Sequence, residues 1–207
     1  DIASVTTNAT GECDVIIDFS NAASTERLLD YCEQHGTPVV ICTTGHSAAQ
    51  LDRIRAASAK IAVFRSGNMS LGINLMSELL KQSAAVLGDK YDVEIIEKHH
   101  NQKVDAPSGT ALALADAVNE SLGNEYHYKY DRTAERVKRD KKEIGIQAIR
   151  GGSIVGEHDV IFAGQDEVVT FQHTAYSKAI FAKGAVQGAK FLAGKAPGMY
   201  DMADVIG

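Results

Sequence analysis

The sequence predicts an α/β unit followed by an α+β unit in a chain of 207 residues. Two observations lead to this fold class. Short apolar runs rich in β-branched residues alternate with helical patterns as far as residue 64, which is typical of parallel strands joined by helical crossovers. Three strand-like runs then follow one another between residues 144 and 173, separated by glycine-containing turns, as in an antiparallel sheet.

The first part of the chain has clear strand and helix signals. Strand-like runs occupy residues 15–19, 38–42 and 61–64. Ser20 or Asn21 can cap the helix after the first run, and Gly36 can end it. Ser47 can cap the helix before the third run. This order predicts three parallel strands that are buried on both faces.

The middle of the chain begins with a long helix over residues 70–87 and a strand from residue 93 to His99-His100. Ser108 is a good cap for a helix over residues 109–122. Residues 124–143 are polar and basic, and we expect a loop or an exposed hairpin there. The three runs that we expect to pair antiparallel cover residues 144–149, 154–163 and 168–173.

The last helix covers residues 177–192, and a Gly/Pro tail follows it. Its apolar face carries Ile180, Phe181, Val186 and Phe191. This helix adds little to an antiparallel sheet, so we expect it to return and pack on the first unit.

Composition narrows the class of protein. Hydrophobic residues make up 44% and charged residues 23% of the chain, which is ordinary for a globular protein. The net charge of -6 disfavours a nucleic-acid partner. No apolar run approaches the ~20 residues of a bilayer span, and no signal peptide is recognisable. The odd set of Cys13, Cys32 and Cys42 lacks Cys-x-x-Cys spacing, which favours incidental thiols in a reducing cytosol.

The densest group of reactive side chains lies in EKHHNQKVDAPSGTA, residues 97–111. The helix that Ser108 caps offers free N–H groups and a positive dipole, which suit a carboxylate or a phosphate. Lys103, just before that helix, can act as a counter-charge or as a proton donor. His99 and His100 end a strand and can shuttle protons near neutral pH. Each of these residues also has an ordinary explanation, as a surface histidine or a simple helix cap.

A metal site is disfavoured in this segment. Adjacent histidines on a strand point to opposite faces, and the stretch has no cysteine or clustered carboxylate to complete a ligand set. Two other loops, Thr43-Thr44-Gly45 and residues 66–70, each follow a predicted parallel strand. Both belong at the carboxyl edge, where dinucleotides bind. However, no G-x-G-x-x-G motif occurs, so the motif case for a nucleotide site is weak.

The stretch from residue 97 to 111 closely resembles the signature of the 4-hydroxy-tetrahydrodipicolinate reductase family, His-His-x-x-Lys-x-Asp-Ala-Pro-Ser-Gly-Thr. Other segments resemble the family in order and spacing: residues 18–20, 43–45, 67–70, 149–152, 155–158 and 200–202. The resemblance implies NADH- or NADPH-dependent reduction of a small dicarboxylate in diaminopimelate and lysine biosynthesis. It also implies a Rossmann-like dinucleotide-binding domain, residues 1–70 and 180–207, and a substrate-binding and oligomerisation domain, residues 71–179, in a homotetramer.

Roles for individual residues follow from the resemblance. It implies His99 as proton donor/acceptor and Lys103 as proton donor. It implies substrate binding by His100, Ser108, Gly109 and Thr110. The cofactor-binding set that it implies is Phe19, Cys42, Thr43, Thr44, Ser66, Gly67, Asn68 and Met69, with no metal. Cys42 stands where the family usually has glycine, so its contact with a cofactor is the least secure of the set.

A larger departure concerns the start of the chain. The family pattern opens with a strand and a Gly-rich turn for the pyrophosphate, followed by the residue that selects NAD or NADP, and none of these is recognisable here. We expect that they precede the given sequence. A truncated homologue that acts as a non-catalytic dicarboxylate-binding or oligomeric module is the alternative. An aspartate-type dehydrogenase shares the cofactor fold but has no known match to the histidine-lysine loop.

Overall fold

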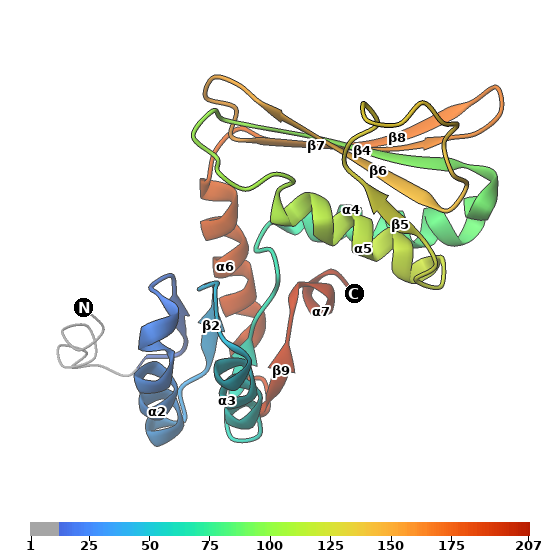
Figure 1. Cartoon of the computed structure of the whole chain (residues 1–207). Coiled ribbons are helices and arrows are strands. Elements are labelled where there is room, and N and C mark those ends of the chain that lie inside the picture. The colour runs from blue at the N-terminus through green and yellow to red at the C-terminus, as the bar shows by residue number, and fades with distance from the viewer. Residues whose placement is uncertain (1–12) are drawn as a thin grey trace. The chain divides into compact units, whose positions relative to one another are not determined.

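The computed structural model describes residues 13–207, so the expectation for the start of the chain lies outside the described residues (Figure 1). The chain forms two compact units. Unit 1 contains the described residues up to Leu71 together with Ala179–Gly207, and unit 2 contains Gly72–Lys178. Each unit has its own sheet and its own buried core.

Unit 1 is built on a parallel sheet with the strand order β1-β2-β3-β9. The strands are β1 (Ile16–Asp18), β2 (Val39–Ile41), β3 (Ala62–Phe64) and β9 (Gly198–Tyr200). The first three confirm the predicted parallel run. The fourth was missed, because the Gly/Pro tail has no strand pattern; its Gly198–Tyr200 segment pairs with β3 through backbone contacts.

Helices cover both faces of this sheet. The helices are η1 (Ala22–Ser24), α2 (Thr25–His35), α3 (Ala48–Ser58), α6 (Ala179–Leu192) and α7 (Met202–Ile206). Val39, Ile41 and Val63 face α2 and α3, whereas Val40 and Phe64 face α6 and α7. Both faces of the central strands are therefore apolar, as the unbroken apolar runs predicted.

Local signals set the ends of these helices. Asn21 caps the short η1 turn by accepting from the backbone N–H of Ala23, and α2 follows directly. Gly36 ends α2 in the left-handed conformation at φ 64°, which glycine adopts at little cost. Ser47 and Gln50 form a capping box at the start of α3. The predictions at Gly36 and Ser47 are confirmed, whereas Asn21 caps the turn before α2 rather than α2 itself, whose first residue follows Ser24.

Helix α6 packs on the unit 1 sheet, as predicted, and part of the predicted apolar face makes the contact. Its buried positions are Gly184, Ala185, Gly188 and Leu192, and Phe181 and Phe191 are partly buried. Val186, expected on the packed face, is 45% exposed. A Cβ on Gly184 would lie 1.6 Å from the carbonyl oxygen of Met69. The close approach of helix and loop therefore selects small residues over the large apolar ones that a hydrophobic pattern emphasises.

Unit 2 is built on a mixed sheet with the order β5-β6-β4-β7-β8. The strands are β4 (Asp92–His99), β5 (His127–Lys129), β6 (Glu143–Arg150), β7 (Gly156–Ala163) and β8 (Val168–Ala175). β7 pairs antiparallel with β4 and β8, but β6 pairs parallel with β4. The predicted antiparallel run is therefore wrong at β6, because β4 lies between β6 and β7.

The connection from β6 to β7 explains this difference. Residues 151–155 cross the end of β4, and there Gly151 N donates to the carbonyl of His99 at 2.9 Å. Five residues reach up to ~17 Å, which is enough to cross two strand spacings of ~4.8 Å each. The basic segment is not a hairpin either, because β5 within it pairs parallel with β6.

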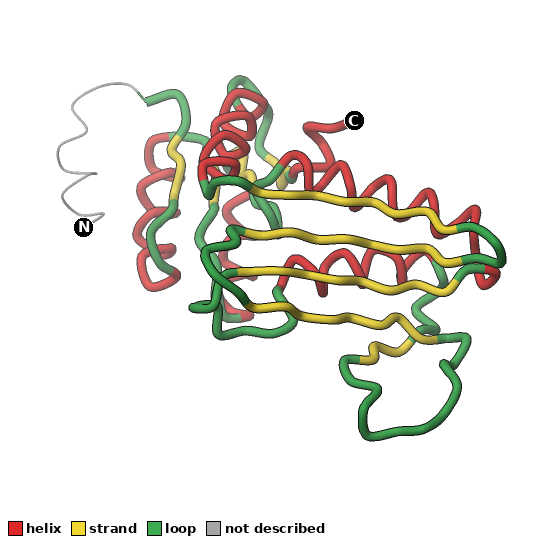
Figure 2. The backbone as a smooth tube through the Cα atoms, turned by 90° about the horizontal axis from the view of Figure 1, so that it is seen from above, coloured by secondary structure: helices red, strands yellow, loops and turns green. Residues whose placement is uncertain are grey.

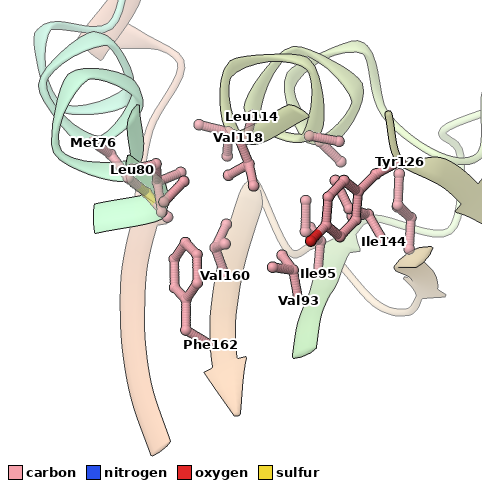
Figure 3. Packing of buried hydrophobic residues seen from close by; sticks show 14 residues of the cluster. Met76, Leu80, Val93, Ile95, Leu114, Val118, Tyr126, Ile144, Val160 and Phe162 are labelled. Atoms are coloured by element: carbon pink, nitrogen blue, oxygen red, sulfur yellow. The ribbon is translucent and has the colours of Figure 1, made fainter. Parts of the chain in front are cut away.

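The unit 2 core lies between the sheet and two helices, α4 (Leu71–Leu87) and α5 (Gly109–Ser121), with a short η2 turn (Gly88–Lys90) after α4. Figure 3 shows side chains of α4 and α5 packed over strand residues such as Ile95 and Phe162. Both helices cover the same face of the sheet (Figure 2). No described helix is long and apolar enough to cross a membrane.

Candidate active site

The row of buried side chains on β4 is apolar in the unit 2 core and polar at the end of the strand. Val93 and Ile95 lie on the helix-facing side of the sheet, and Glu97 and His99 continue the same row. Glu97 is fully buried and His99 is 9% exposed. The period of two in a strand therefore places a carboxylate and an imidazole at the end of the apolar core, under the start of α5.

Glu97 receives hydrogen bonds from three directions. Arg150, which stands opposite His99 in the β4–β6 register, donates Nη1 to Oε2 at 2.8 Å and Nη2 to Oε1 at 2.7 Å. The backbone N–H of Ser108 donates to Oε1 at 3.0 Å. His99 Nδ1 lies 2.6 Å from Oε2. Burial alone would raise the pKa of Glu97, but the bonds from Arg150, His99 and Ser108 outweigh burial and hold it below its usual range.

Ser108 caps α5 and also joins it to the sheet. Its Oγ accepts from the backbone N–H of Ala111 at 3.1 Å, which confirms the predicted cap. The same oxygen lies 3.0 Å from Nε2 of His158 on β7. Gly109 is exposed and no atom lies near the position of a Cβ there, whereas Thr110 is half-buried. The amino end of α5 is thus fixed at Ser108 and open at Gly109.

His158 lies beside His99, with ring centroids 5.2 Å apart and an interplanar angle of 73°. Burial, followed by the charge of His99, lowers the pKa of His158 from 6.5 to about 4. His158 is therefore a neutral ring at physiological pH. It serves as a hydrogen-bond partner of Ser108 rather than as a charge.

Lys103 and His100 lie in the loop after β4. Lys103 Nζ lies 2.8 Å from Asp105 Oδ1, and this bond above all lowers the pKa of Asp105. The side chain of Lys103 is only 22% exposed. Its partner Asp105 also accepts from Arg150 through the backbone carbonyl, and Arg150 binds Glu97. His100 is half-buried and follows His99 on the alternate side of the chain.

Unit 1 contains a pocket of about 290 Å³ at the carboxyl ends of its parallel strands. Seven of the eight residues in the predicted cofactor set line it: Phe19, Cys42, Thr44, Ser66, Gly67, Asn68 and Met69. Phe181 from α6 completes the lining. The walls combine two aromatic rings and two sulfur side chains with hydroxyl and amide groups. This mixture suits a flat ring that carries a carboxamide.

Thr43, the eighth predicted residue, does not line the pocket. Its hydroxyl donates to Oδ2 of the buried Asp18 at 2.7 Å, and Asp18 Oδ1 accepts from the hydroxyl and the backbone N–H of Ser20. Asp18 thus ties the end of β1 to the loop after β2. Burial raises the pKa of the Cys42 thiol to about 12, so Cys42 is a neutral wall of the pocket.

Sequence reasoning missed several residues of these two clusters: Asp18, Glu97, Arg150, His158 and Phe181. All of them except Phe181 lie in segments that resemble the family, but the sequence did not indicate a role for the individual residues. Their signal is spatial, since Arg150 and His158 reach Glu97 and Ser108 from strands about fifty positions away in the chain. Within residues 13–207, no group of three or more His, Cys, Asp or Glu side chains could hold a metal ion.

Comparisons with known proteins match nearly the whole chain. The family model "Dihydrodipicolinate reductase, N-terminus" matches residues 1–69, and "Dihydrodipicolinate reductase, C-terminus" matches residues 72–206. A 4-hydroxy-tetrahydrodipicolinate reductase of Clostridium novyi is 52% identical over 193 residues, 93% of this chain and 76% of the relative. The enzyme of that name from Caldanaerobacter subterraneus is 51% identical over 94% of this chain and 77% of its own length.

Solved structures show the same fold. A dipicolinate-bound dihydrodipicolinate reductase from Paenisporosarcina sp. TG-14 superposes with a TM-score of 0.75 at 24% identity, covering 97% of this chain and 76% of its own. A probable dehydrogenase from Thermotoga maritima superposes with a TM-score of 0.56 at 11% identity, covering 99% of this chain and 77% of its own. The predicted α/β fold of the first unit is confirmed, and the second unit is α+β as predicted, with a sheet that is mixed rather than antiparallel.

Proposed function

The chain belongs to the dihydrodipicolinate reductase family, and from that premise we propose how its two units divide the reaction. The activity is that of a 4-hydroxy-tetrahydrodipicolinate reductase, which uses NADH or NADPH to form tetrahydrodipicolinate in diaminopimelate and lysine biosynthesis. In the proposal, unit 1 binds the nicotinamide cofactor and unit 2 binds the dicarboxylate. The observation that carries it is the gathering of seven predicted cofactor residues around one pocket.

The pocket of unit 1 fits the nicotinamide end of the cofactor. Phe19 is 55% exposed at the end of β1 and offers a flat apolar face. Thr44 and Asn68 offer groups that can bond to a carboxamide. When bound, the reduced cofactor supplies the hydride. Asp18 and Thr43 contribute by holding the two strand ends at a fixed distance.

In unit 2, the open amino end of α5 binds one carboxylate of the substrate. Ser108, Gly109 and Thr110 form this end, and His100 and Lys103 add positive charge or donors from the loop before it. The match of a capped helix with a lysine and a histidine supports a dianionic ligand, and the dipicolinate in the Paenisporosarcina relative's name is a small dicarboxylate of this kind.

Reduction of the ring also requires a proton. The amine of Lys103 can donate a proton and is held in place by Asp105, so we assign it as the proton donor. His99 acts as proton donor/acceptor near it. Asp105 orients the ammonium without removing its proton, because its own pKa is lowered by that contact.

The proposal extends to assembly and location. The face of the unit 2 sheet opposite α4 and α5 carries half-exposed apolar side chains, Ile149 at 47% and Val168 at 61%. This face is the proposed contact surface of a homotetramer in the cytoplasm. The expected result is a particle of four chains in analytical ultracentrifugation, and a monomer at all concentrations would contradict it.

The experiment that tests the activity is a spectrophotometric assay of the full-length protein. The substrate is generated in place from pyruvate and aspartate semialdehyde by the preceding synthase, and oxidation of NADH and of NADPH is followed separately. Substrate-dependent loss of absorbance is expected with at least one cofactor. If a folded protein oxidises neither, the alternative of a non-catalytic dicarboxylate-binding module replaces the reductase.

A further inference from the structure

We propose that Glu97 is a positioning residue that acts through His99: it holds the imidazole with its proton on Nδ1 and leaves Nε2 free to accept one. The inference rests on the proposed function, in which His99 is the proton donor/acceptor. It goes beyond that function because it assigns a role to a carboxylate that lies under the site. It also predicts the tautomer of His99.

The first step is the charge state of Glu97. Its carboxylate is fully buried, and such a charge is stable only when its oxygens are well bonded. Arg150 binds both oxygens in a forked arrangement, at 2.8 and 2.7 Å, and its guanidinium is always charged. The backbone N–H of Ser108 adds a third donor. Glu97 is therefore ionised, and its oxygens can only accept.

The second step fixes the proton of His99. Nδ1 lies 2.6 Å from Oε2 of Glu97. Because an ionised carboxylate has no hydrogen to donate, Nδ1 must be the donor and must carry the proton. A neutral imidazole has one N–H, so Nε2 is then the acceptor. The tautomer follows from the bonds around Glu97 and needs no assumption about the substrate.

The third step concerns the space around Nε2. A Cβ on Gly156 would lie 3.1 Å from Nε2 of His99 and 3.4 Å from Cδ2, so a side chain there would press on this edge of the ring. The neighbouring ring of His158 has its own Nε2 committed to Ser108 at 3.0 Å. Glycine at position 156 and the bond between His158 and Ser108 thus both keep neighbours away from the accepting nitrogen.

The test is Glu97→Gln, which preserves shape and removes the charge. The amide nitrogen must face either Ser108 or His99, and Arg150 loses one acceptor in both cases. If the amide nitrogen faces Ser108, two donors meet, because the backbone N–H of Ser108 cannot become an acceptor. Facing His99, it can donate to Nδ1 if the ring moves its proton to Nε2. We therefore expect the variant to switch the tautomer of His99.

The readout is the pair of ¹⁵N shifts of His99 in the full-length enzyme at mildly alkaline pH, assigned by comparison with His99→Gln. The wild type should show protonated Nδ1 and bare Nε2, and Glu97→Gln the reverse. We expect kcat to fall on the order of 100-fold, with KM for the dicarboxylate within a few-fold because the amide oxygen still accepts from Ser108. A general loss of fold would not produce this split.

Glu143→Gln is the matched control. Glu143 is a second buried carboxylate of the same sheet, 4% exposed, and it pairs with Arg132 instead of the site. This variant should keep the wild-type tautomer of His99 and the wild-type kcat.

The outcomes separate the two proposals. A wild-type His99 with its proton on Nε2 overturns the inference, and this measurement needs no variant to fold. Wild-type kcat and an unchanged tautomer in Glu97→Gln overturn it as well. If the wild type has the expected tautomer but no reductase activity, the positioning by Glu97 stands and the proposed function fails.

Discussion

Burial of His158 should make the stability of this protein depend on pH in a calculable way. The pKa of His158 is lowered from 6.5 to about 4 in the folded state, first by burial and then by the charge of His99. Between these two values the unfolded chain binds more protons than the folded chain. The free energy of unfolding therefore rises with pH across this window. The part of the stability that depends on His158 is fully present above pH 6.5 and is lost as the pH falls toward 4.

The size of the effect follows from the same two values. The span from 6.5 to about 4, at ~1.36 kcal/mol for each pKa unit, corresponds to roughly 3 kcal/mol in full. Between pH 7 and pH 5 the loss is about 2 kcal/mol by the same linkage. Carboxyl groups with lowered pKa, such as Glu97, lose their contribution only below their ordinary range near 4.5, so they do not add to the change in this window.

The assay is urea unfolding at pH 7 and pH 5 with the protein concentration held constant. His158→Gln keeps a hydrogen-bonding group for Ser108 but has no proton to take up. The wild type should lose about 2 kcal/mol more than this variant between the two pH values. His127→Gln, at a ring whose side chain is 56% exposed, is the control and should follow the wild type. Equal pH dependence in the wild type and His158→Gln would refute the reasoning.

Three further predictions concern catalysis and packing. Lys103→Ala should lower kcat by two or more orders of magnitude with an unchanged circular dichroism spectrum; near-normal turnover would remove Lys103 from the mechanism. Gly184→Ala brings a Cβ to 1.6 Å from a backbone oxygen, so overpacking of ~1–3 kcal/mol should exceed the helix-propensity gain of ~1 kcal/mol. Calorimetry should then show a lower Tm for Gly184→Ala than for the wild type. Lys183→Ala, at an exposed position of the same helix, is the control and should keep the wild-type Tm. A raised Tm in Gly184→Ala would contradict the close contact. Thr43→Val leaves Oδ2 of the buried Asp18 without its donor and should cost about 1–3 kcal/mol in urea unfolding, and equal stability would show that this bond contributes nothing.

The fold was predictable where the signal is local. The caps at Ser47 and Ser108 and the left-handed stop at Gly36 each depend on a few neighbouring residues, and the structure has them where the sequence places them. The position of β4 between β6 and β7 depends instead on a five-residue crossing that no local pattern reveals. For the same reason β9 was missed, since a three-residue strand is defined by its partner β3.

The site divides in the same way. The loops that line the unit 1 pocket follow strands that were recognisable, so their place at the carboxyl edge could be reasoned from topology. The hydrogen bonds to Glu97 could not be predicted in this way, because its partners Arg150 and Ser108 come from separate elements. A buried glutamate on an apolar strand face contradicts the local pattern. Such a contradiction is a place to expect function.

Stability alone does not explain the Glu97–Arg150 pair. Replacing a buried ion pair with well-packed apolar residues is often neutral or even stabilising, by about 1–4 kcal/mol, whereas removing one partner is costly. The pair also lies at the end of an apolar core whose buried cluster does not include either residue. What this pair supplies, and an apolar pair could not, is a fixed acceptor for His99 Nδ1 and for the N–H of Ser108. One carboxylate thereby sets both the proton position of His99 and the start of the helix proposed to bind the substrate.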